Sequence, residues 1–289
     1  MKALFVRCYG KLTADMMIGG LIDMGVPPVY LKSKLEDAGL SAPFIEKANP
    51  KAQISAHYFH IPETGEKPML LKERDIFKLW RDICEKGAPE WEDTGWKVFS
   101  ALTSGASDAI DEIAGNIIDL RRIGVSEENL ISLYLFLACL DYLEVESLFV
   151  VPFSLKEGRS EHARATLHIL TDAGSTVGKP IDAEDIHPFA AAMLEGLAAK
   201  FMPMDGRFLA DKTAYGSASA EKPTGESTVA EYLGYFQDRG DSIFSRHLKV
   251  FGMAGDLFYF IRIRLFAAVQ LRYFFISRKK FRFGSRSFI

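Results

Sequence analysis

Cys8, Asp15 and His162 are the side chains of this sequence best placed to bind a metal or an anion. Cys8 ends a short apolar run, residues 2–8, which has the length and type of a buried strand. Asp15 stands in the first turn of a predicted helix, where the helix dipole favours a carboxylate. A strand, a tight polar turn and a helix N-terminus together are a common place for an anion or metal site. A purely structural strand–turn–helix unit explains the same pattern.

The six histidines are scattered along the chain, and each alone is a weak indication of a metal site. His162 follows the end of a predicted strand in a polar stretch, where binding residues often lie. His57 and His60 are three residues apart on a predicted strand, so they point to opposite faces and do not bind one metal together. We therefore interpret His57 and His60 as exposed strand residues. His187 precedes a proline at a predicted helix start and indicates a turn.

Tyr215 and Gly216 open a run of small residues, 215–219, that is predicted to form a flexible turn. Such a turn can approach a phosphate closely, although a plain connector fits the composition as well. The sequence has no Walker A loop, no GxGxxG motif and no GxSxG motif. The residues alone thus indicate one candidate site, near Cys8, Asp15 and His162.

Apolar periodicity predicts the elements that must position these residues. Helical spacing is found over residues 14–24, 29–38, 73–86, 91–120, 130–143 and 184–201, strand-like runs over 2–8, 53–61 and 147–155, and two further ordered elements over 206–215 and 227–236. Thr13 is the expected N-cap of the first helix, and Ser126 is that of the most apolar one. A helix followed directly by a strand favours a mixed α/β (α+β) fold, with a central sheet and several packed helices.

The composition is that of an ordinary globular protein, with 48% hydrophobic and 25% charged residues. The sequence does not have the basic segment followed by an apolar one that marks a secretory signal peptide. The three cysteines form no CxxC pair and no disulfide framework, so a reducing cytoplasm fits best. Residues 246–289 carry ten Lys or Arg and one acid, against 25 basic and 37 acidic groups in residues 1–245. This shift predicts a domain over 1–245 and a basic aromatic tail over 246–289, which need not belong to the fold.

Several segments, taken in order, resemble the LarC-type nickel insertion proteins of nickel-pincer cofactor synthesis. Residues 1–27 are similar to the family's opening, a strand followed by D-C-x-S-G-I-S-G-D-M and L-L-G-A-L-L-D-L-G-V-P. Residues 139–155 resemble A-L-D-Y-L-G-V-E and the strand after it, and residues 215–218 stand where the family has Y-G-A-G. The matches spread over about residues 1–240, and the ordered set implies membership of the family.

The sequence also departs from the family pattern at positions that matter for chemistry. The leading Asp of the opening motif is Arg7 here, and residues 10–14 lack the backbone freedom of two of its glycines. The histidine-rich loop expected after the strand ending at Ile61 is replaced by residues 62–68, which contain no histidine. The family's C-terminal domain, associated with CTP and a divalent metal, has no counterpart in this sequence.

The resemblance implies that an active member inserts nickel into a pyridinium bis-thiocarboxylate mononucleotide, driven by CTP, as a nickel-inserting lyase. Cys8, Asp15 and His162 would then be the nickel ligands or orient the substrate, and Asp15 would also be the catalytic residue. Tyr215 and Gly216 would belong to a cofactor-binding segment. CTP with its divalent metal would require a separate C-terminal subunit. Soft sulfur donors on the substrate suit Ni(II).

Two other functions fit the same sequence. A non-catalytic paralogue, acting as a binding or scaffolding subunit, accounts for the missing histidines, glycines and CTP domain. The hypothesis that the protein binds anionic membrane surfaces depends on the basic tail alone. A membrane span in the tail is disfavoured by four charged residues, Asp256, Arg262, Arg264 and Arg272. A homo-oligomer is compatible with these functions, and no nucleic-acid partner is expected.

Overall fold

The computed structural model describes residues 1–49, 54–62, 71–110, 118–172 and 180–236. Their helices are α1 (Ala14–Asp23), α2 (Pro28–Asp37), α3 (Glu73–Gly87), α4 (Glu92–Ala109), α5 (Glu127–Tyr142), α6 (Glu161–Asp172) and α7 (Pro188–Leu197). Their strands are β1 (Lys2–Cys8), β2 (Ile45–Asn49), β3 (Ala56–His60), β4 (Ser147–Val150), β5 (Ser154–Lys156), β6 (Pro180–Asp182), β7 (Ala198–Phe201), β8 (Phe208–Ser217) and β9 (Thr228–Phe236). Met1–Phe236 form one compact unit. The predicted boundary near residue 245 and the tail 246–289 lie outside the described residues.

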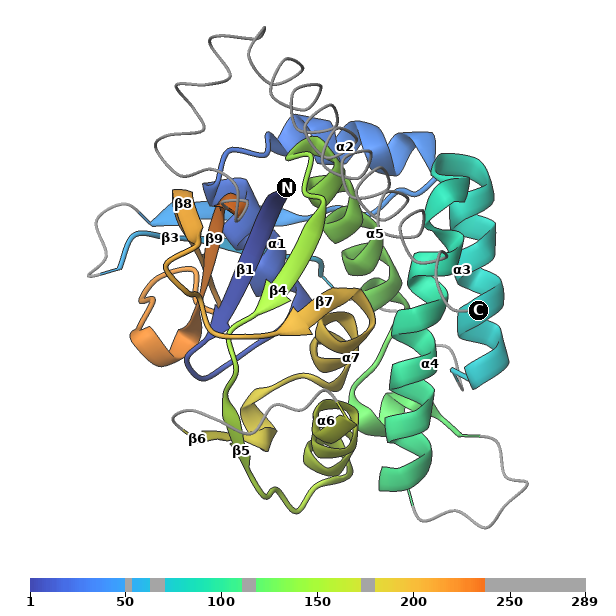
Figure 1. Cartoon of the computed structure of the whole chain (residues 1–289). Helices are drawn as coiled ribbons and strands as arrows, with labels where there is room; N and C mark the ends of the chain where they lie inside the picture. The colour runs from blue at the N-terminus through green and yellow to red at the C-terminus, as the bar shows by residue number, and fades with distance from the viewer. Residues whose placement is uncertain (50–53, 63–70, 111–117, 173–179, 237–289) are drawn as a thin grey trace, which may run out of the picture. The chain divides into compact units, whose positions relative to one another are not determined.

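A seven-stranded mixed sheet in the order β2-β3-β8-β9-β1-β4-β7 forms the centre of the unit (Figure 1). β1 pairs in parallel with β4 and antiparallel with β9, so that Phe5 stands between Phe149 and Tyr232. β8 pairs antiparallel with β9, and β3 joins β8 in parallel. Helices pack against this sheet, which confirms the predicted α/β class.

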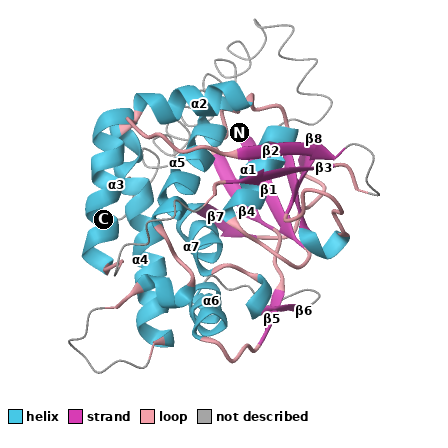
Figure 2. Ribbon diagram, turned by 180° about the vertical axis from the view of Figure 1, so that it is seen from behind, coloured by secondary structure: helices cyan, strands magenta, loops and turns pink. Residues whose placement is uncertain are grey.

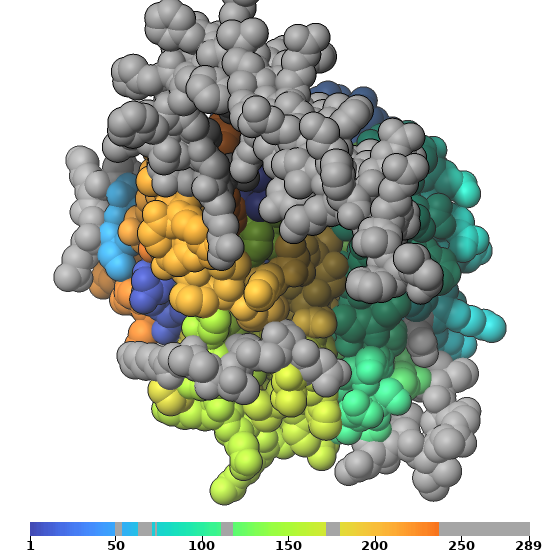
Figure 3. All heavy atoms as spheres, viewed as in Figure 1, coloured from blue at the N-terminus to red at the C-terminus, as the bar shows by residue number. Residues whose placement is uncertain are grey.

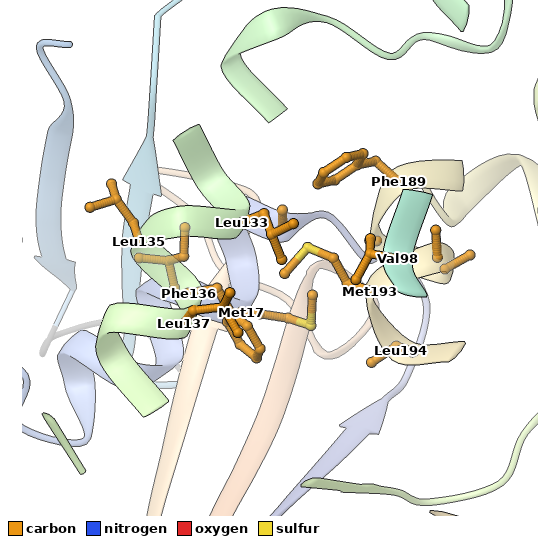
Figure 4. Packing of buried hydrophobic residues seen from close by; sticks show 14 of the residues in the cluster. Met17, Val98, Leu133, Leu135, Phe136, Leu137, Phe189, Met193 and Leu194 are labelled. Carbon is orange, nitrogen blue, oxygen red and sulfur yellow. The ribbon is translucent and has the colours of Figure 1, made fainter. Parts of the chain in front are cut away.

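The alternation of side chains along β1 shows which face of the sheet the helices cover. Leu4 and Val6 belong to the main hydrophobic core, together with side chains of α1, α4, α5 and α7. Figure 4 shows side chains of these four helices gathered in that core. Phe5 belongs to a second cluster, where its ring centroid lies 5.1 Å from that of Phe149 and 4.6 Å from that of Phe208.

α1 lies very close to the sheet. Its N-cap is Thr13, as predicted, and the Oγ1 atom of Thr13 accepts a hydrogen bond from Met16 N at 3.2 Å. A Cβ atom on Gly19 would lie 2.5 Å from the carbonyl oxygen of His57 in β3, and one on Gly216 would lie 1.7 Å from the carbonyl oxygen of Met16. Glycine at both positions therefore permits the approach of helix and strands.

α5 is the buried core helix that its composition predicts. Its first turn is held by Asn129, whose side-chain oxygen accepts a hydrogen bond from Ser126 N at 2.9 Å. The residues from Leu130 to Cys139 are nearly all buried, because the helix packs against α1 and α2. Among the described residues, no helix combines the length and the apolar character needed to cross a membrane.

Two predicted elements are divided in the structure. The strand predicted over 147–155 is in fact β4 and β5, which are separated around Pro152, and β5 pairs with β6 beside α6 (Figure 2). The helix predicted over 184–201 ends at Leu197, after which β7 pairs in parallel with β4. Pairing at the sheet edge overrides the helix propensity of the local sequence. On the face seen in Figure 3, the gold atoms that follow α7 adjoin a small group of yellow-green atoms, in agreement with the pairing of β7 with β4.

Candidate functional site

A cavity of about 380 Å³ lies where the N-terminal ends of three helices meet the ends of two strands. The helices α1, α5 and α7 border it with their N-cap residues, Thr13, Ser126 and His187. His60 at the end of β3 and Ser217 at the end of β8 complete this wall. A cavity of this size holds a small molecule, and helix N-termini favour an anionic group on that molecule.

Asp15 forms hydrogen bonds with residues of other elements at one wall of the cavity. Its Oδ2 atom lies 3.0 Å from His60 Nδ1 and accepts a hydrogen bond from Ile61 N at 3.3 Å. Its Oδ1 atom accepts a hydrogen bond from Ser132 Oγ at 2.9 Å. The carboxylate is therefore held from α1, β3 and α5 at once, and its position is set by tertiary packing rather than by a flexible loop.

The hydrogen bond to Asp15 also sets the tautomer of His60. A carboxylate only accepts hydrogen bonds, so Nδ1 is the donor to Asp15, and Nε2 is the ring nitrogen that remains for a ligand. Among the described residues, Nε2 has no hydrogen-bond partner. Glu128, in the first turn of α5, is a second carboxylate on the wall. Imidazole nitrogens and carboxylates are suitable donors for a divalent transition metal.

His187 forms part of the wall, but both of its ring nitrogens are engaged. Nδ1 accepts a hydrogen bond from Phe189 N at 3.2 Å, and Nε2 donates to the carbonyl oxygen of Gly124 at 3.0 Å. Burial, with a smaller effect of His162, lowers the pKa of His187 to about 4, so the ring is neutral near pH 7. His162 itself lies against His187, with 5.5 Å between ring centroids, and its Nε2 is 3.1 Å from the carbonyl oxygen of Ile186.

The thiol of Cys8 lies in the hydrophobic core and not on the cavity wall. Its Sγ atom donates to the carbonyl oxygen of Gly10 at 3.1 Å, and burial raises its pKa to about 12. The thiol is therefore protonated near pH 7, whereas metals bind the thiolate. In the part of the chain that the structure describes, no group of three or more His, Cys, Asp or Glu side chains is placed to hold a metal ion. The structure does not gather Cys8, Asp15 and His162 into one ligand set.

Tyr215 and Gly216 belong to β8, so the prediction of a flexible turn is wrong for these two residues. Tyr215 N donates a hydrogen bond to Asp23 Oδ2 at 3.1 Å, and Gly216 packs against α1. The next two residues, Ser217 and Ala218, line the cavity. The predicted segment therefore borders the candidate site, but it does so through the residues that follow the predicted pair.

Comparison with known proteins decides the family. A family model described as nickel insertion protein matches residues 4–255 of the chain. The chain belongs to the nickel insertion protein family. The matched range contains every residue that lines the cavity, so the candidate site lies within the part of the chain that the family defines.

Curated members of the nickel insertion protein family are distant relatives. A putative nickel insertion protein of Geotalea daltonii is 23% identical over 239 residues, which cover 76% of this chain and 58% of the relative. One of Synechococcus sp. is 24% identical over 242 residues, with 77% and 58% covered. A pyridinium-3,5-bisthiocarboxylic acid mononucleotide nickel insertion protein of Thermotoga sp. is 22% identical over 255 residues, with 82% and 62% covered. The chain thus spans less than two thirds of the length of these relatives, and no solved structure gives a significant match.

Sequence reasoning missed His60 and Ser132 as residues of the site. His57 and His60 occupy opposite faces of β3, but the prediction that both are exposed is wrong for His57, which is 8% exposed and lies 2.6 Å from Glu46 Oε2. Asp15 is separated by 45 residues from His60 and by 117 from Ser132, so no local pattern in the sequence predicts that these side chains meet. The usable signal was the place of His60 at the end of a predicted strand, where binding residues often lie.

Proposed function

We propose that this chain inserts nickel into a pyridinium bisthiocarboxylate mononucleotide, the activity for which the Thermotoga relative is named. The observation that carries the proposal is the pair of Asp15 and His60 on the wall of a cavity large enough for a small molecule. An imidazole nitrogen suits nickel, and the sulfur atoms of the substrate supply further donors. Because substrate and protein share the ion, the protein does not need a complete set of ligands of its own.

The electrostatics of the cavity support a substrate that is itself anionic. A mononucleotide carries a phosphate, and the two thiocarboxylates add further negative charge. The positive ends of the α1, α5 and α7 dipoles border the cavity and favour such groups. Asp15 and Glu128 on the same wall favour the nickel cation. The cavity thus combines helix ends for the anionic substrate with side chains for the metal.

The other predicted site residues, CTP and the cellular compartment also belong to the proposal. Cys8 and His162 stay untested predictions as nickel ligands, since neither lines the cavity. Ser217 and Ala218, which follow Tyr215 and Gly216, do line it. That CTP and its divalent metal are handled by a separate C-terminal subunit stays a proposal. The compartment we propose is a reducing cytoplasm, which keeps the three cysteines as free thiols.

Calorimetric titration of the full chain with a nickel salt tests the proposal. Asp15→Asn should weaken nickel binding by about tenfold or more, because the substitution removes the charge that orients His60. Asp23→Asn is the matched control, since Asp23 lies on the same helix but does not line the cavity. Insertion is followed by mass spectrometry of the mononucleotide, with and without CTP. An unmodified chain that binds no nickel would refute the proposal.

The departures of the sequence from the family pattern favour a second candidate, a non-catalytic binding subunit. Arg7 stands in place of the family's leading Asp, and residues 62–68 contain no histidine where the family has a histidine-rich loop. Such a subunit would bind nickel, the mononucleotide or both. It would release whatever it binds unchanged, also in the presence of CTP. Formation of the nickel-containing product by the purified chain alone would exclude this second candidate.

A further inference from the structure

Two side chains, Asp15 and Ser132, hold the His60 ring in one orientation. Ser132 Oγ donates to Asp15 Oδ1 at 2.9 Å, and Asp15 Oδ2 lies 3.0 Å from His60 Nδ1. Ser132 is 1% exposed, whereas the side chains of Asp15 and His60 are 23% and 44% exposed. The series therefore runs from the buried Ser132 through the half-buried Asp15 to His60 at the cavity.

This arrangement is the one that metal-binding histidines commonly use. A histidine ligand donates its second ring N–H to a carboxylate or a carbonyl, which fixes the tautomer and makes the coordinating nitrogen more basic. Both oxygens of Asp15 already accept hydrogen bonds, from His60 and Ile61 on one side and from Ser132 on the other. Asp15 is thus placed to orient the His60 ring, whereas Nε2 of His60 is placed to coordinate the metal.

We propose that His60 Nε2 is the nitrogen donor through which the chain holds nickel, with Asp15 and Ser132 as positioning residues. This inference rests on the proposed nickel insertion and names the protein ligand of that same site. One firm donor leaves other coordination positions to the sulfur atoms of the substrate and to water. Such an open site suits an ion that must leave with the product, because a closed set of protein ligands would retain it.

His57 provides a matched comparison on the same strand. It also pairs with a carboxylate, since its Nε2 atom lies 2.6 Å from Glu46 Oε2. His57 is buried and does not line the cavity, whereas His60 does. Substitution of either residue removes a histidine–carboxylate pair from β3, but only the His60 substitution removes a nitrogen from the cavity wall.

Nickel titration of His60→Gln, His57→Gln and Ser132→Ala, each in the full chain, tests the inference. The Kd for Ni²⁺ should rise about a hundredfold in His60→Gln and about tenfold in Ser132→Ala, and it should stay unchanged in His57→Gln. X-ray absorption at the nickel edge should show an imidazole ligand in the unmodified chain, in His57→Gln and in Ser132→Ala. The same signal should be absent from His60→Gln, and loss of packing alone would not produce this difference.

The outcomes separate the inference from the function on which it rests. Nickel insertion by the unmodified chain, with an unchanged Kd and imidazole signal in His60→Gln, would overturn the inference and leave the function standing. Absence of nickel binding by the unmodified chain would overturn both. The X-ray absorption spectrum of the unmodified chain tests the inference even if a variant fails to fold. Bound nickel without an imidazole ligand would contradict the assignment of His60 as a nickel ligand directly.

Discussion

Replacing Glu231 by glutamine should stabilise the folded chain near pH 7 and do so much less at pH 5. Glu231 lies in β9 and is 0% exposed, and neither of its carboxyl oxygens has a hydrogen-bond partner in the described part of the chain. The carboxyl fits under α1 because residue 20 is glycine, where a Cβ atom would lie 2.4 Å from Glu231 Oε2. Burial, and secondly the charge of Asp23, raises the pKa of Glu231 well above its ordinary value of 4.5.

The sign of the effect follows from the protons that each state of Glu231 binds. In the unfolded chain the carboxyl ionises near pH 4.5, whereas in the folded chain it stays protonated to a much higher pH. Stability therefore falls as the pH rises from 4.5 towards the pKa of the folded state. The loss is about 1.4 kcal/mol for each pH unit within that interval. Glutamine does not titrate, so the variant escapes this loss.

Urea unfolding at pH 5, 6 and 7 measures the effect. The difference in unfolding free energy between Glu231→Gln and the unmodified chain should grow with pH, by about 1.4 kcal/mol for each pH unit below the pKa of the folded state. Glu221→Gln is the control, because Glu221 is exposed and its substitution should give a difference near zero throughout. A difference for Glu231→Gln that stays constant over this range would refute the reasoning, since the carboxyl would then ionise at the same pH in both states.

Two further substitutions test the packing and capping of α1. Gly216→Ala should lower the unfolding free energy by about 3 kcal/mol, because the new methyl group would lie 1.7 Å from the carbonyl oxygen of Met16. Gly206→Ala is the control and should be nearly neutral, because its methyl group would meet no non-neighbouring residue of the described part of the chain within 4 Å. Equal urea midpoints for the two variants would contradict the close approach. Thr13→Ala should cost about 1 kcal/mol through loss of the hydrogen bond to Met16 N, and Thr13→Ser should restore most of it in thermal unfolding. A Thr13→Ser variant as unstable as Thr13→Ala would show that the cap contributes little.

Local sequence patterns were sufficient to predict several of the elements, because caps and periodicity act over one or two turns. Thr13 caps α1, and the apolar run from Leu130 forms α5, as their residue types indicate. The helix predicted over 184–201 is wrong at its end, where Ala198 pairs with Leu148 at the sheet edge. That pairing depends on a strand far away in the sequence, and the propensity of a short window does not contain it.

The candidate site was predictable only for Asp15, whose place in the first turn of a helix is a local property. Cys8 and His162 were grouped with Asp15 by residue type, but residue type does not reveal burial, and the thiol of Cys8 points into the core. His60 and Ser132 reach Asp15 through the packing of β3 and α5 on α1, which no spacing rule predicts. The resemblance to a family located the chemistry on this part of the chain, and only the fold shows which side chains meet there.

The geometry of the cavity depends on how closely α1 approaches the sheet. Asp15 lies in the first turn of α1 and His60 at the end of β3, and their 3.0 Å contact closes only if the helix and the strand touch. Gly19 permits that approach, since a Cβ atom there would lie 2.5 Å from the carbonyl oxygen of His57. A residue without functional groups thus sets a distance on which the orientation of His60 depends. Substitutions that widen the contact between α1 and β3 would therefore disturb the site before they unfold the chain, because the hydrogen bond tolerates only a few tenths of an ångström.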